Sequence, residues 1–349
     1  MKTRYSTAAS LATMAQIWKI LLMTVSVLVV HLSLIGPALS RGVGGHATKL
    51  IIDTDAGSDD AVAILLALAL PAQVDVLAVT CSYGNTRETN VETNVLKLLT
   101  VAARPDIPVY AGAKGPLLRN YSAGDYFGKD GLGDFEFGRP LAAGVNRTKH
   151  AAVAMIDLAK QHPGEVSVLT LGPLTNLALA ITLDKDFAKA VKRFYVMGSL
   201  IDEGETPEQP QVEFNFSLDP EANAIALSAM RNASGLVVPW DVIHENAIAK
   251  EWRTEVLGKL GGERVAFLNR AEYAVLERVG AWHAADSMAL AAALWPELVR
   301  SSLEARMTAA TCGPRDGAVR VDHKGASNVE IVRAFDVEGF KRRLLDHLA

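Results

Sequence analysis

From residue 49 onward, short β-branched and aliphatic runs alternate along the chain with longer amphipathic or apolar stretches. The short runs predict strands at Lys49–Asp53, Val74–Thr80, Val109–Ala111, Val166–Leu171, Phe194–Met197, Leu236–Val238, Val319–Val321 and Val329–Val332. The longer stretches predict helices at Asp59–Ala69, Asn90–Ala103, Ala151–Gln161, Leu174–Leu183, Pro220–Met230, Ala249–Lys259, Gly262–Arg278, Ser287–Leu294 and Val337–Leu348. This alternation predicts an α/β protein with a mainly parallel, Rossmann-like central sheet flanked by helices.

Two long segments between these elements carry no regular pattern: residues 112–146, which contain eight glycines, and residues 198–216. Loops of this length in compact domains are usually functional lids or disordered segments. Ligands bind parallel sheets beyond the carboxyl ends of the strands, where both segments begin. We therefore expect both to be lids over a site.

The first 40 residues differ from the rest of the chain. They carry three basic residues and no acidic one, and an apolar run at 20–39 ends in small residues. This pattern predicts a signal peptide cleaved after Ser40 and a secreted protein. An uncleaved membrane anchor is the alternative, because the apolar run is nearly long enough to span a bilayer. Residues 41–349 are then expected to form one domain.

The composition is globular, with 50% hydrophobic and 21% charged residues. Without residues 1–40, the chain keeps 32 of its 35 basic residues and all 39 acidic ones, a net charge of −7. It then contains no basic cluster, which argues against a nucleic-acid partner and leaves a small-molecule ligand as the expectation.

Two further residue types bear on export. Four N-x-S/T sequons fit a secretory route: Asn120, Asn146, Asn215 and Asn232. The two cysteines, Cys81 and Cys312, are compatible with one disulfide or with two buried free thiols, and the sequence does not decide between these.

The stretch IIDTDAGSDDAV places four aspartates between the first predicted strand and the first predicted helix: Asp53, Asp55, Asp59 and Asp60. Capping of the helix N-terminus explains one or two acidic residues there, at roughly 0.3–1 kcal/mol each. Four neighbouring carboxylates raise one another's pKa unless a cation lies among them. Since all the available ligand atoms are oxygen, the stretch favours a hard divalent metal, although its spacing is not that of an EF-hand.

Other predicted strands are also followed by polar residues. These are Asn85 in SYGN, the segment GPLTN after residue 171, Glu213 and Asn215 in VEFN, and Asp286 at the start of a late helix. Each has an ordinary explanation as a turn residue or a helix cap, and Met197 is an ordinary core residue. Their common position at strand ends nevertheless favours a shared site.

Taken in order, several segments resemble the motifs of one enzyme family. They are DTDAGSDDAVAILLAL, TCSYGN, LGPLTNLALA, VMGS, VEFNFSLDPEA and ADSMALAAAL, spread over residues 49–294. The set resembles that of the nucleoside hydrolases, the inosine–uridine-preferring nucleoside N-ribohydrolases. The opening motif is moderately specific alone, and the ordered set is strongly specific.

The resemblance implies one Ca²⁺ per subunit and an enzyme that is a homodimer or tetramer. The implied metal ligands are Asp55, Asp60, Asp286 and the backbone carbonyl of Leu171, with Asp53 beside them as an anchor. The ion is expected to bind a water molecule and the ribose 2′- and 3′-hydroxyls. Asp55 would accept the proton of that water, and Asp55 and Asp59 are the implied catalytic residues. The residues expected to contact the sugar are Asp59, Asn85, Met197, Glu213 and Asn215.

The chain departs from the family pattern where the base would leave. Many members have histidine immediately before the late aspartate, where this chain has Ala285, and the nearest histidine is His283. Phe127 stands where a lid histidine is often found, and residues 203–212 are lengthened and lack a usual asparagine. Purine-specific relatives stack aromatic side chains on the base, for which Phe127 and Trp282 are candidates. Trp240 is a third candidate or a core residue.

The resulting hypothesis is a purine-leaning hydrolase that cleaves the N-glycosidic bond of ribonucleosides such as inosine through an oxocarbenium-like transition state. The main alternative is a nucleoside-binding protein that has kept the Ca²⁺ site and lost most catalysis. A haloacid-dehalogenase-like phosphatase also places DTD at a strand end, but the GPLTN segment fits that class poorly.

Overall fold

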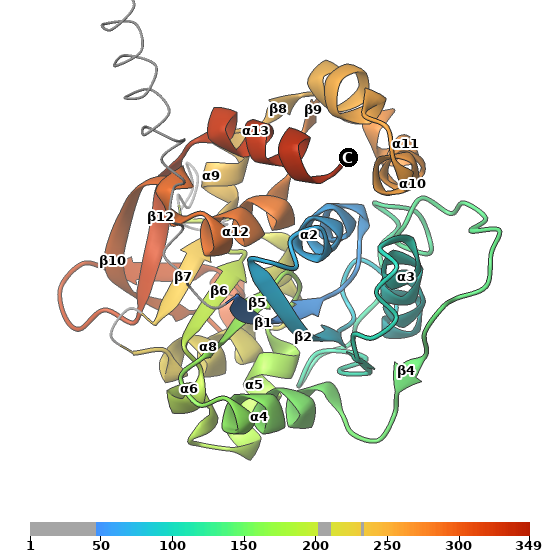
Figure 1. Cartoon of the computed structure of the whole chain (residues 1–349). Coiled ribbons are helices and arrows are strands. Elements are labelled where there is room, and N and C mark those ends of the chain that lie inside the picture. The colour runs from blue at the N-terminus through green and yellow to red at the C-terminus, as the bar shows by residue number, and fades with distance from the viewer. Residues whose placement is uncertain (1–46, 202–210, 232–233) are drawn as a thin grey trace, which may run out of the picture. The chain divides into compact units, whose positions relative to one another are not determined.

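A ten-stranded sheet in the order β11-β10-β12-β7-β6-β5-β1-β2-β3-β4 organises the described part of the chain (Figure 1). The structure is a computed structural model that describes residues 47–201, 211–231 and 234–349. Residues 47–349 form one compact unit. The predicted signal segment, the middle of the second lid and the sequon at Asn232 lie outside the described residues.

The strands of this sheet are mainly parallel, as predicted. They are β1 (Thr48–Thr54), β2 (Val74–Cys81), β3 (Val109–Tyr110), β4 (Val145–Asn146), β5 (Val166–Thr170), β6 (Arg193–Met197), β7 (Gly235–Val238), β10 (Val299–Ala309), β11 (Val319–Asp322) and β12 (Val329–Phe335). Among the described strands of this sheet, β10 alone is antiparallel to its neighbours β11 and β12. A separate antiparallel pair joins β8 (Ile248–Ala249) to β9 (Ala281–Trp282).

Helices cover both faces of the sheet because its central strands bury both of their sides. Leu50 and Ile52 of β1 pack into one core and the intervening Ile51 into the other, as the two-residue period of a strand requires. Figure 1 shows α2 (Ser58–Leu68) and α12 (Ala285–Leu294) on one face, and α4 (Ala151–Gln161), α5 (Thr175–Leu183) and α8 (Pro220–Ala229) on the other.

The remaining helices lie mostly at the edges of this arrangement. They are α3 (Glu88–Val101), α6 (Phe187–Ala190), α7 (Phe214–Leu218), α9 (Trp240–Glu245), the π-helical turn η1 (Trp252–Val256), the 3₁₀ turns η2 (Leu257–Lys259), η3 (Pro296–Leu298) and η4 (Gly313–Arg315), α10 (Glu263–Ala271), α11 (Tyr273–Leu276) and α13 (Val337–His347).

Most predicted elements are present with ends that differ by one or two residues. The long strand β10 was not predicted, because its sequence VRSSLEARMTA is largely polar and buries only Ala305 and Met307. A single helix was predicted over 262–278, but the structure has two helices there, because the helix is interrupted between α10 and α11. The segment 249–259 contains a π-helical and a 3₁₀ turn where one helix was predicted.

Two other expectations concern cysteines and sequons. Cys81 is buried and Cys312 is exposed, and both are free thiols, so neither the disulfide nor the pair of buried thiols is present. Asn120 is exposed, whereas Asn215 is buried with its side-chain amide hydrogen-bonded, so the side chain of Asn215 is not accessible for glycosylation in this fold. In the described residues, no helix has the length and apolarity needed to cross a membrane.

Candidate functional site

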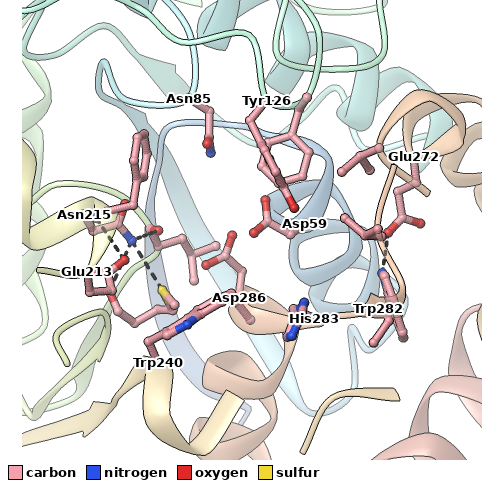
Figure 2. A pocket seen from close by; sticks show the side chains of 18 of the residues that line it. Asp59, Asn85, Tyr126, Glu213, Asn215, Trp240, Glu272, Trp282, His283 and Asp286 are labelled. Carbon is pink, nitrogen blue, oxygen red and sulfur yellow. Dashed lines mark hydrogen bonds between the residues drawn. The ribbon is translucent and has the colours of Figure 1, made fainter. Parts of the chain in front are cut away.

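The four early aspartates gather at the carboxyl edge of the sheet, where β1 ends and α2 begins. Carboxylate oxygens of Asp59, Asp60 and Asp286 all lie within 4.8 Å of one another. Asp286 comes from the first turn of α12, more than two hundred residues along the chain. Figure 2 shows Asp59 and Asp286 pointing toward the same space.

Asp60 is fully buried and is held by several neutral donors. The Thr54 hydroxyl donates to its Oδ1 at 2.5 Å, and the Gly57 N–H donates to its Oδ2 at 2.8 Å. The side-chain amide of Asn85 also donates to Oδ2, at 3.3 Å. These bonds fix the carboxylate at the start of α2.

Asp53 and Asp55 lie behind this group and are also fully buried. Oδ1 of Asp53 accepts hydrogen bonds from the Thr80 hydroxyl (2.6 Å) and the Asn176 amide (2.9 Å). Oδ2 of Asp55 accepts the Asn85 backbone N–H at 2.7 Å.

Among the described aspartates of this group, three buried carboxylate oxygens have no hydrogen-bond donor: Asp53 Oδ2, Asp55 Oδ1 and Asp286 Oδ1. A buried acceptor without a donor is costly, and a charged one more so. A hard cation satisfies acceptors of this kind, and the carboxylates that lie close enough together to share one are Asp59, Asp60 and Asp286, so the residues present fit a divalent metal. The expected ligand Asp55 is not part of that group of three.

The electrostatics lead to the same conclusion. Burial, followed by repulsion from Asp60, raises the pKa of Asp55, Asp59 and Asp286 well above the usual aspartate value. Burial also raises the pKa of Asp53, to about 7. A bound cation lowers such pKa values by favouring the ionised form.

The aspartates open onto a pocket of about 460 Å³, within the range of small-molecule sites. One side of the pocket is polar, with Glu213 and Asn215 (Figure 2). Glu213 caps α7 and accepts backbone N–H bonds from Ser199, Asn215 and Phe216. Its carboxylate is therefore rigidly placed at the pocket wall.

Asn215 joins the polar side to the sheet. Its side-chain amide donates to the backbone carbonyl of Leu171 at 2.8 Å and approaches Met197 Sδ at 3.4 Å. The Leu171 carbonyl, expected to be a metal ligand, thus has a hydrogen-bond partner in this structure. All three residues line the pocket.

The other side of the pocket is mainly apolar. Its lining includes Tyr126, Phe127, Val275, Leu276, Val279 and Trp282, and Trp240, His283 and Ala285 also line the pocket. Phe127 and Trp282 therefore lie where a ligand could contact them, and Trp240 lines the pocket as well. Glu272 is the acidic residue of this apolar side.

Residues 112–146 form part of this wall, as expected for a lid. The Tyr121 hydroxyl donates to the carbonyls of Gly84 (2.7 Å) and Thr86 (2.9 Å) and ties the segment to the β2–α3 loop. The guanidinium of Arg278, just after α11, donates to the carbonyl of Tyr126. The segment thus brings Tyr126 and Phe127 over the pocket.

The structure brings nearly all of the predicted site residues together. Asp59, Asn85, Leu171, Met197, Glu213, Asn215 and Asp286 line the pocket, while Asp53, Asp55 and Asp60 are fully buried and are not among its lining residues. Asp59, expected to contact the sugar, is also one of the three clustered carboxylates. The division of these residues into metal ligands and sugar contacts stays a prediction.

Sequence reasoning missed part of the apolar side: Tyr126, Glu272, Val275, Leu276 and Val279. Tyr126 adjoins the predicted Phe127, which was the available signal for it. The other four lie on or beside two short helices with no distinctive motif.

The chain is similar to the proteins of one known family. The family model for inosine-uridine preferring nucleoside hydrolases matches residues 50–342. The chain belongs to this family.

Several individual nucleoside hydrolases are similar to the chain. A probable uridine nucleosidase 2 from Arabidopsis thaliana is 39% identical over 58% of the chain and 62% of that protein. A pyrimidine-specific ribonucleoside hydrolase from Salmonella arizonae is 36% identical over 58% of the chain and 63% of its own length. The chain thus spans little more than half the length of most curated relatives it matches.

Solved structures of nucleoside hydrolases match more of the chain. A plant nucleoside hydrolase has a TM-score of 0.77 and 30% identity, covering 86% of this chain and 98% of that structure. An inosine-guanosine nucleoside hydrolase has a TM-score of 0.78 and 28% identity with the same coverage. Members of this family are metal-dependent, in agreement with the aspartate cluster.

Cation binding should therefore change how stability depends on pH. A raised aspartate pKa means that the cation-free folded protein keeps protons that the unfolded chain loses near pH 4. The retained protons stabilise the folded protein relative to the unfolded chain. This contribution to stability is fully present below about pH 4 and is lost as the pH rises through the pKa in the folded protein, which is about 7 for Asp53. Calorimetry of chelated protein should show a lower Tm at about pH 8 than at about pH 5.5.

Added Ca²⁺ should raise Tm more at the higher pH, because protons no longer compete for the same oxygens. An equal Ca²⁺-induced shift at both pH values would contradict the assignment of these aspartates to a cation site.

A second prediction concerns the space around Asp55. A Cβ atom at Gly84 would lie 2.0 Å from Asp55 Oδ2, so Gly84→Ala must displace that carboxylate. We expect Ca²⁺ affinity, measured by titration calorimetry, to fall by ~10–100-fold. Gly124→Ala is the matched control, because a Cβ atom there meets no atom within 4 Å. Unchanged affinity in a folded Gly84→Ala variant would show that Asp55 lies outside the metal site.

Proposed function

We propose that the chain hydrolyses the N-glycosidic bond of ribonucleosides, releasing the free base and ribose. One observation carries the proposal. The clustered aspartates Asp59, Asp60 and Asp286, with Asp53 and Asp55 beside them, form what we call the aspartate cage. The pocket next to this cage has a polar wall on one side and an aromatic wall on the other. Such a pocket suits a sugar at the cage and a flat base against the aromatic side chains. The names of the relatives as nucleosidases and nucleoside hydrolases support the same reaction.

The residues around the cage would position the sugar and stabilise its charge. A bound Ca²⁺ would supply orientation of a water molecule and of the ribose hydroxyls, and would lower the pKa of that water. The unpartnered Oδ1 of Asp55 is available to accept a proton from it. Asp59 and Asp286 place negative charge where an oxocarbenium-like sugar becomes positive.

The sugar hydroxyls would also be held by polar side chains other than the aspartates. Asn85, Glu213 and Asn215 line the pocket on separate segments, after β2 and at the start of α7. Because backbone donors fix the Glu213 carboxylate, it needs little reorganisation to accept a hydroxyl proton in a hydrogen bond. A ribose that lacks its 2′-hydroxyl would lose part of this network.

The departing base needs a separate partner, because Ala285 has no proton to give. His283 lines the pocket, and its Nε2 is buried without a hydrogen-bond partner. Its ring stacks on that of His244 (5.7 Å between centroids) and lies tilted beside Trp240 (5.1 Å). Burial and the neighbouring His244 lower the pKa of His283, so the neutral ring would donate a hydrogen bond to the base.

The apolar wall supports a preference for purine bases. Tyr126, Phe127 and Trp282 offer a wide aromatic surface, which favours a bicyclic base over a smaller one. Several curated relatives are named as uridine nucleosidases or pyrimidine-specific ribonucleoside hydrolases, whereas one solved structure is named for inosine and guanosine. The base preference is therefore proposed from the pocket of this chain.

The reaction is tested by removing the proposed base. Asp55→Ala should lower kcat for inosine by at least ~10³-fold, because a positioned general base contributes about that much. Chelation of the wild-type protein should abolish base release, and Ca²⁺ should restore it. Chromatographic detection of hypoxanthine and ribose measures both effects, and the exposed Asp106→Asn variant is the control. Full turnover by both the Asp55→Ala variant and the chelated wild-type protein would contradict the mechanism. Nucleoside binding without base release would support the binding-protein alternative.

The base preference is tested with a nucleoside panel. We expect kcat/KM for inosine and guanosine to exceed that for uridine and cytidine by about tenfold, the effect of ~1.4 kcal/mol of added stacking. A 2′-deoxy nucleoside should be a poor substrate because it loses its contacts at the cage. Higher kcat/KM for uridine would overturn the purine preference and leave the hydrolase assignment intact.

A further inference from the structure

A hydrogen bond to Glu272 holds Trp282 in the apolar wall of the pocket. Trp282 lies in β9, is 4% exposed and lines the apolar side of the pocket. Its indole Nε1–H donates to Glu272 Oε1 at 2.6 Å, a bond drawn in Figure 2. Rotation about χ2 of an aromatic side chain has broad minima, so contacts of this kind decide how the ring faces the pocket.

Glu272 is in turn fixed by an ion pair that is completely buried. Its Oε2 accepts Arg253 Nε at 2.8 Å and lies 2.5 Å from Nη2, and both side chains are about 1–2% exposed. Arg253 also donates to Asn269 Oδ1 at 2.8 Å, which links the pair to α10. The Trp282 indole is thus the third member of a chain of charge-assisted hydrogen bonds.

Residues around Arg253 support the indole from further back. Arg253 lies in the π-helical turn η1, a rare geometry that occurs frequently at functional sites. The preceding Trp252 stacks with Trp282 at 6.3 Å and 24°, and the Arg253 guanidinium lies 5.7 Å from the Trp282 ring centre. In the described part of the chain, neither Trp252 nor Arg253 lines the pocket.

Stability alone is a weak reason for this arrangement. A buried ion pair loses so much hydration that apolar residues of similar volume are often as stabilising. A Leu and a Met would fill the same space, but they would leave the indole N–H without an acceptor and its orientation free. What the charged pair adds is a fixed position for one ring in the ligand pocket.

We propose that the Arg253–Glu272 ion pair is a positioning device that holds Trp282 as the surface on which the nucleobase stacks, and thereby sets base selectivity. The proposal rests on the proposed nucleoside hydrolase function and adds the residues that control its base subsite. Arg253 is a positioning residue, because it does not line the pocket and acts through Glu272 and Trp282. Glu272 lines the pocket as well as holding the indole, so Trp282→Phe is the variant that tests the indole contact alone.

The test replaces the pair by apolar side chains. Removing one partner alone would leave a buried unpaired charge and destabilise the fold, so the main variant is the double substitution Arg253→Leu/Glu272→Met. We expect the folded double variant to show a KM for inosine raised by about tenfold and an altered ratio of kcat/KM between inosine and uridine. Inhibition by free ribose should be unchanged, because ribose would contact only the cage side.

Trp282→Phe is the second variant and keeps an aromatic ring while deleting the N–H donor. Its matched control is Trp295→Phe, because Trp295 is also buried and donates its indole N–H, to Gln73, but does not line the pocket. We expect Trp282→Phe to shift KM and base selectivity in the same direction as the double variant, and Trp295→Phe to leave both unchanged.

A double variant that melts like the wild type and keeps its KM and base selectivity would overturn the proposal, since the pair would then have only a structural role. If the double variant does not fold, unchanged kinetics in Trp282→Phe overturn it instead. If the wild-type chain releases no base from any nucleoside, the proposed function fails separately. The same variants are then compared by the Kd for inosine, where unchanged affinity overturns the positioning role.

Discussion

The rest of the site depends on one constraint: several negatively charged carboxylates lie close together at the buried carboxyl edge of the sheet. Asp53, Asp55 and Asp60 are completely buried, and Asp286 is nearly so. The partners of the first three are hydroxyl, amide and backbone N–H groups, which stabilise an anion without cancelling its charge. Mutual repulsion therefore remains, and a divalent cation relieves it at a fixed point in the pocket.

Much of the fold follows from the sequence because its inner strands are buried on both sides. β1, β2 and β5 are short stretches rich in apolar and β-branched residues, and their ends were predicted within one or two residues. β10 gives no such signal, because it lies near the edge of the sheet and exposes most of its residues. Its pairing with β12 is determined by tertiary contacts that no local pattern encodes.

The site divides in the same way. The aspartate cage could be predicted because the carboxyl ends of parallel strands meet at one edge of the sheet. Several polar residues at these strand ends are more than turns and helix caps require, so they indicate a site. The apolar wall could not be predicted, because Val275, Leu276 and Val279 look like ordinary helix and core residues. Glu272 and Arg253 each read as common charged residues, and only their burial against Trp282 reveals a connection to the pocket.

This division has a physical consequence for specificity. The cage is built into β1, α2 and α12, where any displacement disturbs the main core. The apolar wall comes from residues 112–146 and from residues 272–282. The first of these segments meets the end of α10 closely, since a Cβ atom at Gly133 would lie 2.7 Å from the Ala271 carbonyl oxygen. None of the clustered aspartates belongs to these segments, so the side chains of the apolar wall can differ while the aspartates stay the same. Relatives named for uridine and for inosine and guanosine fit such a scheme, in which one fixed cage is combined with different base walls.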